Sequence, residues 1–373
     1  MRILGALVVA GAVGACGRIG FEPVGDGGPA ADAMPDAATP IAEHACNTVM
    51  NLGMPMPLVG APTGQWLTAA ALPSGVVLAQ STTAGLSLFP IDFTQSPPVL
   101  GAAVTSPALG SNLQVAVSAD RVMTSGTLAG GTQITITSTS LAPIVSRNEQ
   151  ALSVGAPDHA VADGSGGWVV ASSENNTTRI DRITADGTFV RGGTWPLNNV
   201  RGASLAAAGP GRYVAVWDLI VLGSCVVRVV DEALVEVAST TIPSCRFIRV
   251  AATADRIGVS YYNGSTLDVI TLSMDLSARS ASQLLSTGHF SPSRTISAAD
   301  GFWTVVPFTM TALHVNHASK QGVPEIERAL DPYDSDAMSF LYDVVAVQGR
   351  AYAVWLSSET GSPSLLVERL CGS

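Results

Sequence analysis

The feature that most constrains the fold of this 373-residue chain is a short turn that recurs at a nearly constant spacing. Each turn leads directly into an apolar segment. The last residues of the seven turns are Gly75, Arg121, Gly167, Arg212, Arg256, Gly301 and Arg350. They are separated by 46, 46, 45, 44, 45 and 49 residues. Self-similarity at such a period indicates a repeat architecture in which each repeat is one supersecondary unit.

The third repeat shows how one unit is built. Four short segments suited to β-strands follow one another, at residues 159–162, 168–173, 178–184 and 188–191. The Asp186-Gly187 pair before the last segment predicts a hairpin turn, because both positions of a two-residue turn favour positive φ. Each repeat is therefore predicted to be a four-stranded antiparallel meander.

The strand after each turn predicts how the meanders pack. In residues 213–217 (YVAVW) and 302–306 (FWTVV), both alternate faces of the strand are largely apolar. Both faces must then be covered by protein, whereas a solvent-facing sheet would alternate. Radially stacked sheets meet this requirement, and the pattern over residues 65–373 resembles the seven-bladed β-propeller, an all-β fold. The last repeat is short, and we expect residues 48–59 to supply its outer strand.

The N-terminus has the features of an export signal. Arg2 precedes the apolar residues 3–13, a run too short to span a bilayer. The sequence Val13-Gly14-Ala15-Cys16 then resembles the lipobox of bacterial lipoproteins. This resemblance implies a signal peptide at residues 1–15, a lipid anchor on Cys16, and sorting to the outer membrane because Gly17 follows in place of Asp. An ordinary secretory signal is the alternative.

The remaining chain divides into a tether and a domain. Residues 16–42 are rich in Ala, Asp, Gly and Pro, a composition that buries little surface and predicts a disordered tether. Residues 43–373 form the predicted propeller. With Cys16 lipidated, four cysteines remain, and closure of the ring predicts the disulfides Cys46–Cys371 and Cys225–Cys245.

Composition excludes some partners. The net charge of −10 and the single lysine argue against nucleic acid, whose phosphates need clustered basic residues. We expect no cofactor and no metal.

The candidate metal ligands have unsuitable spacing. His314 and His317 are three residues apart and fall on opposite faces of a strand. The acidic cluster Asp331, Asp334 and Asp336 lacks the ligand spacing of a calcium loop, so a solvated loop is favoured. We expect a monomer attached to the membrane only through Cys16.

The candidate ligand-binding residues lie on the loops that follow the second strand of each repeat. These loops vary in length and chemistry, whereas the turns before that strand reuse mainly Gly, Asp and Arg. Binding specificity usually resides in loops that vary. The candidates are Glu174, Asn175, Trp217, Asp218, Tyr262 and Glu359. For the large aromatic residues that end these strands, Trp217, Tyr261 and Trp355, packing between blades is the favoured interpretation.

These observations favour a non-catalytic, surface-tethered binding or scaffold lipoprotein that recognises a protein or glycan on one propeller face. No Gly-x-Ser-x-Gly, His-Glu-x-x-His or Walker motif occurs in the sequence. Two alternatives stay open. One is an extracytoplasmic hydrolase or lyase with its site at the mouth of the channel, and the other is a structural subunit of an envelope complex.

The lipobox gives a direct test. The variant Cys16→Ala should lose membrane fractionation and labelling by a fatty-acid analogue, because the acylated thiol is absent. Unchanged membrane association of this variant would contradict the assignment of Cys16.

Overall fold

The computed structural model describes most of the chain from residue 39 onward. The described residues are 39–53, 67–82, 85–106, 111–128, 131–149, 159–174, 177–197, 199–220, 223–287, 293–309, 312–330, 342–357 and 364–372. They belong to one compact unit, Ala38–Ser373. The predicted signal peptide, Cys16 and most of the predicted tether lie outside the described residues.

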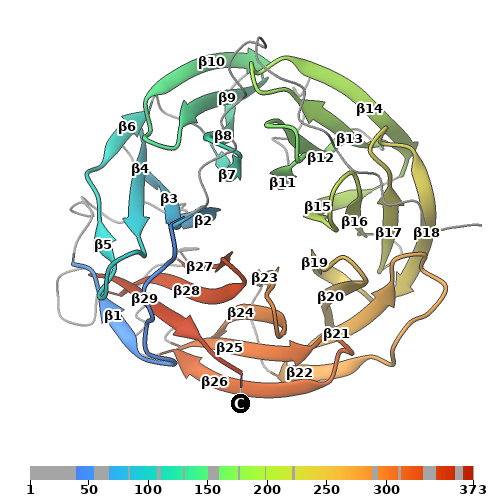
Figure 1. Cartoon of the computed structure of the whole chain (residues 1–373). Coiled ribbons are helices and arrows are strands. Elements are labelled where there is room, and N and C mark those ends of the chain that lie inside the picture. The colour runs from blue at the N-terminus through green and yellow to red at the C-terminus, as the bar shows by residue number, and fades with distance from the viewer. Residues whose placement is uncertain are drawn as a thin grey trace, which may run out of the picture. The chain divides into compact units, whose positions relative to one another are not determined.

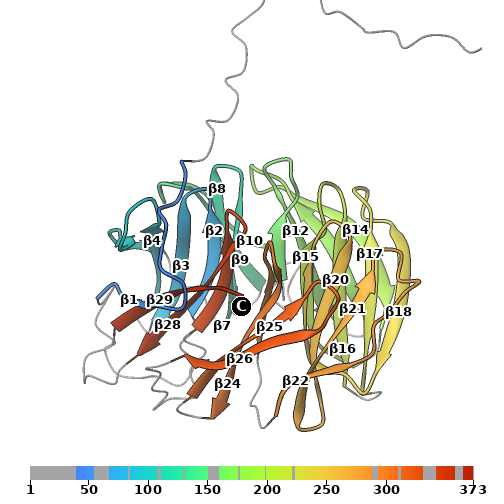
Figure 2. The same ribbon diagram turned by 60° about the horizontal axis from the view of Figure 1, so that its bottom comes forward.

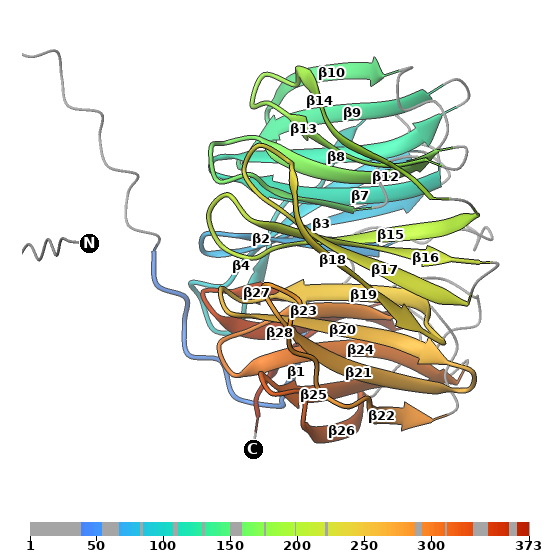
Figure 3. The ribbon, with the colours of Figure 1, turned by 90° about the vertical axis from the view of Figure 1, so that its right-hand side faces the viewer.

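This unit is a seven-bladed β-propeller, as the repeats predict (Figure 1). Each blade is an antiparallel sheet whose strands follow one another from the axis outward, and the ring is seen edge-on in Figure 3. Blade 1 is β2 (Leu67–Leu72), β3 (Gly75–Thr82), β4 (Gly85–Asp92) and an outer edge split into β5 (Val99–Leu100) and β6 (Val104–Ser106). Blade 2 is β7 (Ser111–Ser118), β8 (Arg121–Leu128), β9 (Gly131–Ser138) and β10 (Pro143–Glu149).

The other blades repeat this order. Blade 3 is β11 (His159–Ala162), β12 (Trp168–Glu174), β13 (Thr177–Ile183) and β14 (Phe189–Pro196), and blade 4 is β15 (Val200–Ala207), β16 (Tyr213–Leu219), β17 (Ser224–Val230) and β18 (Glu236–Pro243). Blade 5 is β19 (Arg246–Ala252), β20 (Arg256–Asn263), β21 (Thr266–Ser273) and β22 (Gln283–Thr287). Blade 6 is β23 (Arg294–Ser297), β24 (Gly301–Thr309), β25 (Ala312–Ser319) and β26 (Pro324–Leu330). Blade 7 is β27 (Tyr342–Val347), β28 (Arg350–Ser357), β29 (Ser364–Leu370) and β1 (Val49–Asn51).

The four strands predicted in the third repeat are all present. The ends of the first three agree to within one residue, whereas the fourth, predicted at 188–191, extends to Pro196. The predicted hairpin at Asp186-Gly187 exists, but it is not a two-residue turn. Ile183 pairs with Phe189, so five residues connect the strands. Gly187 has a φ of 80°, and Asp186 is not among the described residues with positive φ. The longer loop lets Asp186 accept a hydrogen bond from the Thr188 N–H at 3.1 Å instead.

The apolar core is divided among the contacts between blades. The buried apolar residues of the described part form seven clusters, and each joins two consecutive blades around the ring. Strand β16 shows the principle. Tyr213, Ala215 and Trp217 pack toward blade 3, whereas Val214 and Val216 pack toward blade 5. Both faces of the second strand are therefore buried, as its sequence predicts.

The two ends of the described chain meet in blade 7. Strand β1 pairs with β29, with Met50 opposite Val367, and supplies the outer strand of this blade (Figure 2). The prediction that residues 48–59 supply this strand is confirmed for Val49–Asn51, while residues 54–59 lie outside the described part. Both predicted disulfides are present, Cys46–Cys371 and Cys225–Cys245.

The segment before β1 also contacts two blades. Ile41 is buried in the cluster between blades 7 and 1. The Nδ1 atom of His44 lies 3.1 Å from the hydroxyl of Tyr352 in blade 7, and its Nε2 atom lies 2.8 Å from the carbonyl oxygen of Gln95 next to blade 1. Residues 41–51 therefore join the first and last blades through packing, hydrogen bonds and a disulfide.

This closure predicts unequal contributions of the two disulfides. The Cys46–Cys371 bridge spans 325 residues and the Cys225–Cys245 bridge spans 20. Loop entropy then predicts a loss of about 4 kcal/mol or more for Cys46→Ser/Cys371→Ser and about 3 kcal/mol for Cys225→Ser/Cys245→Ser. Urea unfolding of both double variants, with hydrogen exchange of β1 and β29, tests this. A larger loss in the second variant would contradict the closure role.

Candidate functional site

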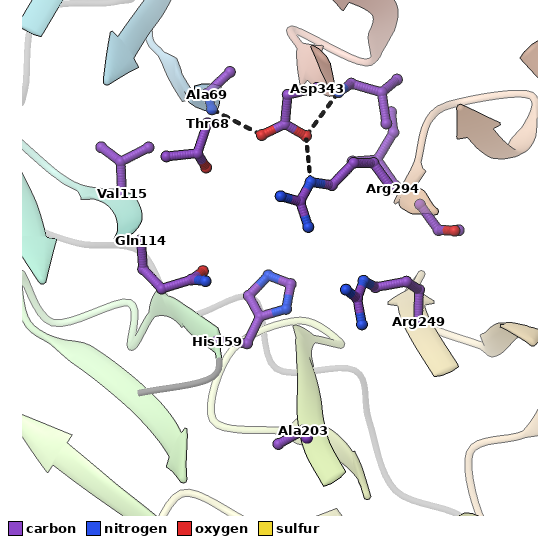
Figure 4. Close-up of a pocket in the computed structure, with 13 residues that line it drawn as sticks. Thr68, Ala69, Gln114, Val115, His159, Ala203, Arg249, Arg294 and Asp343 are labelled. Carbon is purple, nitrogen blue, oxygen red and sulfur yellow. Dashed lines mark hydrogen bonds and ion pairs between the residues drawn. The ribbon is translucent and has the colours of Figure 1, made fainter. Parts of the chain in front are cut away.

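A cavity of about 250 Å³ lies on the axis of the ring. Residues from all seven innermost strands line it, and most of its polar side chains come from the first half of each strand. Figure 4 shows Gln114, His159, Arg249 and Arg294 directed toward the centre of the ring. The polar side chains of the lining are Thr68, Gln114, His159, Arg249, Arg294, Thr295 and Asp343.

Most of these residues occupy one equivalent position of the repeat. Thr68, Gln114, His159, Ser204, Arg249, Arg294 and Asp343 follow one another at 45 or 46 residues, except for a last interval of 49. Ladder pairing supports the equivalence, because Gln114, Arg249 and Arg294 each pair with a residue eleven positions later in the second strand. The same structural position therefore varies in chemistry around the ring, with arginine in blades 5 and 6 and five other residue types in the remaining blades.

Arg294 and Asp343 form the ion pair of the cavity. The Arg294 Nε atom lies 3.8 Å from Asp343 Oδ1. Asp343 also accepts hydrogen bonds from the backbone N–H groups of Ala69 and Val344, both at 2.8 Å. Burial raises the pKa of Asp343 above its usual value, and the charge of Arg294 opposes this shift. The carboxylate is thus held by two backbone groups and one guanidinium, and it joins blade 7 to blade 1.

Arg249 and His159 complete the polar wall. Arg249 donates from Nε to the Ser293 carbonyl at 3.0 Å and from Nη1 to the Ile248 carbonyl at 2.7 Å, which fixes its orientation. The Nδ1 atom of His159 lies 3.5 Å from the Ser204 hydroxyl. Desolvation, reinforced by the charges of Arg249 and Arg294, lowers the pKa of His159 to about 3. The imidazole is therefore neutral at physiological pH and offers one donor and one acceptor.

The cavity is locally cationic in an acidic protein. Two arginines and one aspartate give the lining residues a net charge of +1 when His159 is neutral. The whole chain has a formal charge of −10. Oriented guanidinium groups at low solvent exposure are the preferred partners of carboxylate and phosphate oxygens. The arrangement is suited to holding a small polar ligand with a negative charge.

Three of the sequence-predicted ligand residues have described side chains, and all three are buried near the ends of second strands: Trp217 and Asp218 in β16 and Tyr262 in β20. Trp217 is fully buried and Asp218 is 2% exposed. Asp218 accepts a hydrogen bond from the Phe247 N–H at 2.8 Å, so it links blades 4 and 5. These two side chains belong to the packing between blades, because neighbouring blades cover them. The favoured interpretation of Trp217 as a packing residue agrees with its burial.

Tyr262 is buried in blade 5 and is not among the residues that line the cavity. Its side chain is 5% exposed and stacks edge-on against Phe247, with ring centroids 6.1 Å apart. Burial raises the pKa of Tyr262, and the charge of Arg249 partly offsets this shift, so the hydroxyl lies within the field of a cavity arginine. Of the other predicted residues, Glu174 ends β12, whereas Asn175 and Glu359 lie outside the described residues.

The histidine pair His314 and His317 lies in strand β25 of blade 6. His314 Nδ1 lies 3.3 Å from Glu327, while His317 is buried and stacks on Trp303 with centroids 4.3 Å apart. The two histidines thus have different neighbours. No group of three or more potential metal ligands occurs in the described part of the chain, and residues 331–341, which hold the acidic cluster, are outside it. Among the described residues, no helix has the length and hydrophobicity to cross a bilayer.

Comparison with known proteins shows the fold alone. The sequence matches no protein-family model and none of the curated proteins. Among solved structures, the chain is similar to hydrazine synthase from Kuenenia stuttgartiensis, with a TM-score of 0.58, 13% identity, and coverage of 89% of this chain and 100% of that chain. It is also similar to a functionally unknown protein from Desulfotomaculum acetoxidans, with a TM-score of 0.53, 14% identity, and coverage of 73% of this chain and 87% of that chain. A third similar structure is the WD40 domain of Toxoplasma gondii coronin, with a TM-score of 0.51, 10% identity, and coverage of 89% of both chains.

Sequence reasoning missed the residues of the cavity. Arg249 and Arg294 lie in the first strands of their repeats, away from the turns and second strands that reveal the period. The signal was available, since the two arginines are 45 residues apart, which is the period of the repeat. Aligning the first strands of the repeats would have placed both arginines and His159 on the channel wall.

The burial of Trp217 and Tyr262 predicts opposite effects of two substitutions. Trp217→Ala should lower the free energy of unfolding by about 3–5 kcal/mol, because it empties a filled interface between blades. The Tyr262 hydroxyl is buried without a hydrogen-bond partner among the described residues. Tyr262→Phe should therefore leave stability unchanged or raise it. Urea unfolding measures both, and wild-type stability of Trp217→Ala would show that this side chain is not part of the core.

Proposed function

We propose that this protein is a lipid-tethered, non-catalytic binding protein of the cell envelope that takes its ligand at the axial end of the propeller where the cavity lies. The observation that carries this proposal is the cationic cavity on the axis, with oriented Arg249 and Arg294 in its wall. The fold by itself decides nothing about function, because propellers serve many functions.

The lining favours binding over hydrolysis. Glycoside hydrolysis needs two carboxylates across the scissile bond. Asp343 is the one carboxylate among the described residues that line the cavity. Its oxygens are engaged by two backbone N–H groups and by Arg294, so it serves the wall between blades 7 and 1. A side chain held in this way is poorly placed to exchange a proton with a substrate.

The proposed location rests on two features. The two disulfides indicate an oxidising, extracytoplasmic compartment. The lipobox-like sequence ending at Cys16 supports attachment to the envelope, with Gly17 supporting the outer membrane. Residues between Cys16 and the ring would act as a tether, and the compact unit begins at Ala38.

The proposed binding face combines the cavity with the loops after the second strands. Gly202 of the cavity wall pairs with Asp218 near the end of β16, and His159 pairs with Ala171 in the middle of β12. The cavity thus lies toward the end of blade 4 at which the second strand stops, and in the sequence Glu174, Asn175 and Glu359 stand at or just after the ends of second strands. A protein segment or a glycan bound in the cavity would extend over these loops.

Binding by the full-length protein in detergent to arrays of glycans and peptides tests this proposal. We expect captured ligands to be lost in a Glu174→Ala/Asn175→Ala/Glu359→Ala variant. They should be retained in Arg256→Ala, a matched change in the turn at the opposite end of blade 5. The same ligands should be recovered intact after incubation. Binding that fails only in Arg256→Ala, or cleavage of the ligand, would contradict the proposal.

A further inference from the structure

We infer that the axial cavity is a binding site for a small organic monocarboxylate that carries hydroxyl groups, with Arg249 and Arg294 as its carboxylate ligands. This inference deepens the proposed binding role and rests on it. Neither the repeats nor the structural neighbours assign a ligand to the axis of the ring.

The donors of Arg294 are the first reason. A guanidinium has five N–H donors. Among the described residues, the polar partner of this side chain is Asp343, at an N–O distance of 3.8 Å, which is longer than a hydrogen bond. The Arg294 side chain is only 18% exposed. A partly buried guanidinium whose donors are turned toward a cavity gains from a polar partner that enters the cavity.

The second reason is that the positive charges of Arg249 and Arg294 both affect the same side chain, His159. The charges of Arg249 and Arg294 each lower the pKa of His159, so both lie within electrostatic reach of the same imidazole. Arg249 is held by two carbonyl oxygens and cannot turn away freely. An anion beside His159 would be attracted by both guanidinium groups at once, in a wall of low solvent exposure where such attraction is strengthened.

Charge balance selects a single negative charge. The two arginines and Asp343 leave an excess of one positive charge when His159 is neutral. A monocarboxylate makes the occupied cavity neutral, whereas a neutral sugar leaves the excess uncompensated. Planar, bidentate pairing with a guanidinium is also the favoured geometry of a carboxylate.

Size and polarity define the rest of the ligand. The cavity volume of about 250 Å³ corresponds to roughly eight water molecules in the liquid. This space admits a hydroxy acid or one sugar acid, and excludes a folded protein. Thr68, Gln114 and neutral His159 supply donors and acceptors that match hydroxyl groups.

Isothermal titration of the full-length protein tests the inference with matched pairs of probes: D-glycerate against glycerol, and D-glucuronate against D-glucose. We expect saturable binding of at least one carboxylate, in the millimolar range or tighter, and none of its neutral partner. Arg249→Gln and Arg294→Gln should each weaken binding by roughly ten- to a hundredfold, the size of a lost charge-assisted hydrogen bond. Arg279→Gln, in an exposed segment of blade 5, removes the same charge and should bind as the wild type.

Two further variants protect the test against loss of folding. Arg249→Lys and Arg294→Lys keep the charge of the wall but lose the planar fork, so they should fold and bind with intermediate affinity. Melting temperatures are recorded for every variant. The inference is overturned if no carboxylate binds, if folded Arg249→Gln and Arg294→Gln bind as the wild type, or if the neutral partners or inorganic sulfate bind equally well. If the inference is overturned but glycans or peptides still bind on the arrays, the proposed binding function stands without this ligand. If a carboxylate binds but no glycan or peptide is captured on the arrays, only the recognition of a larger ligand is overturned.

Discussion

Apolar packing between neighbouring blades is the constraint on which the whole ring depends. The described core is divided into seven clusters between consecutive blades, so no blade can bury its own faces. The second strand is buried on both faces, as Tyr213 to Trp217 show in β16. The innermost strands also have positions that line the cavity on the axis of the ring. Those positions are left to vary in chemistry, and they hold the arginines, the histidine and the aspartate of the cavity.

Much of the fold could be predicted because packing of this kind leaves a periodic trace. The turns at Gly75 through Arg350 marked every blade, and the apolar second strands required cover on both sides. The two disulfides followed from the position of the cysteines once the ring was assumed. Local detail was less predictable. The Asp186-Gly187 loop is longer than the dipeptide suggests, because side-chain hydrogen bonds from Asp186 stabilise a five-residue connection.

The site was less predictable than the fold, for a physical reason. The residues next to Arg294 in the sequence do not indicate that it lines a cavity, because that cavity is formed together with residues from the other blades. Trp217 stands beside a variable loop, which is the sequence context of a binding residue, and it is fully buried, in agreement with the interpretation as a packing residue. The chemistry of a channel is visible only when equivalent positions of distant repeats are compared, as with Arg249 and Arg294 on neighbouring innermost strands.

The attachment of residues 41–51 to both end blades has a mechanical consequence. A force applied to the N-terminus reaches the ring first at Thr39, whose carbonyl accepts a hydrogen bond from Gln348 at 2.9 Å, and at the buried Ile41. It then reaches Glu43, which pairs with Arg369 and, at 2.9 Å, with Arg350, and after that the Cys46–Cys371 bridge. Because this bridge joins the pulled segment covalently to the C-terminal end, the load passes into the backbone and does not peel β1 away from β29 one hydrogen bond at a time. The disulfide that closes the ring therefore also protects the pairing of β1 with β29 against a pulling force applied to the N-terminal segment.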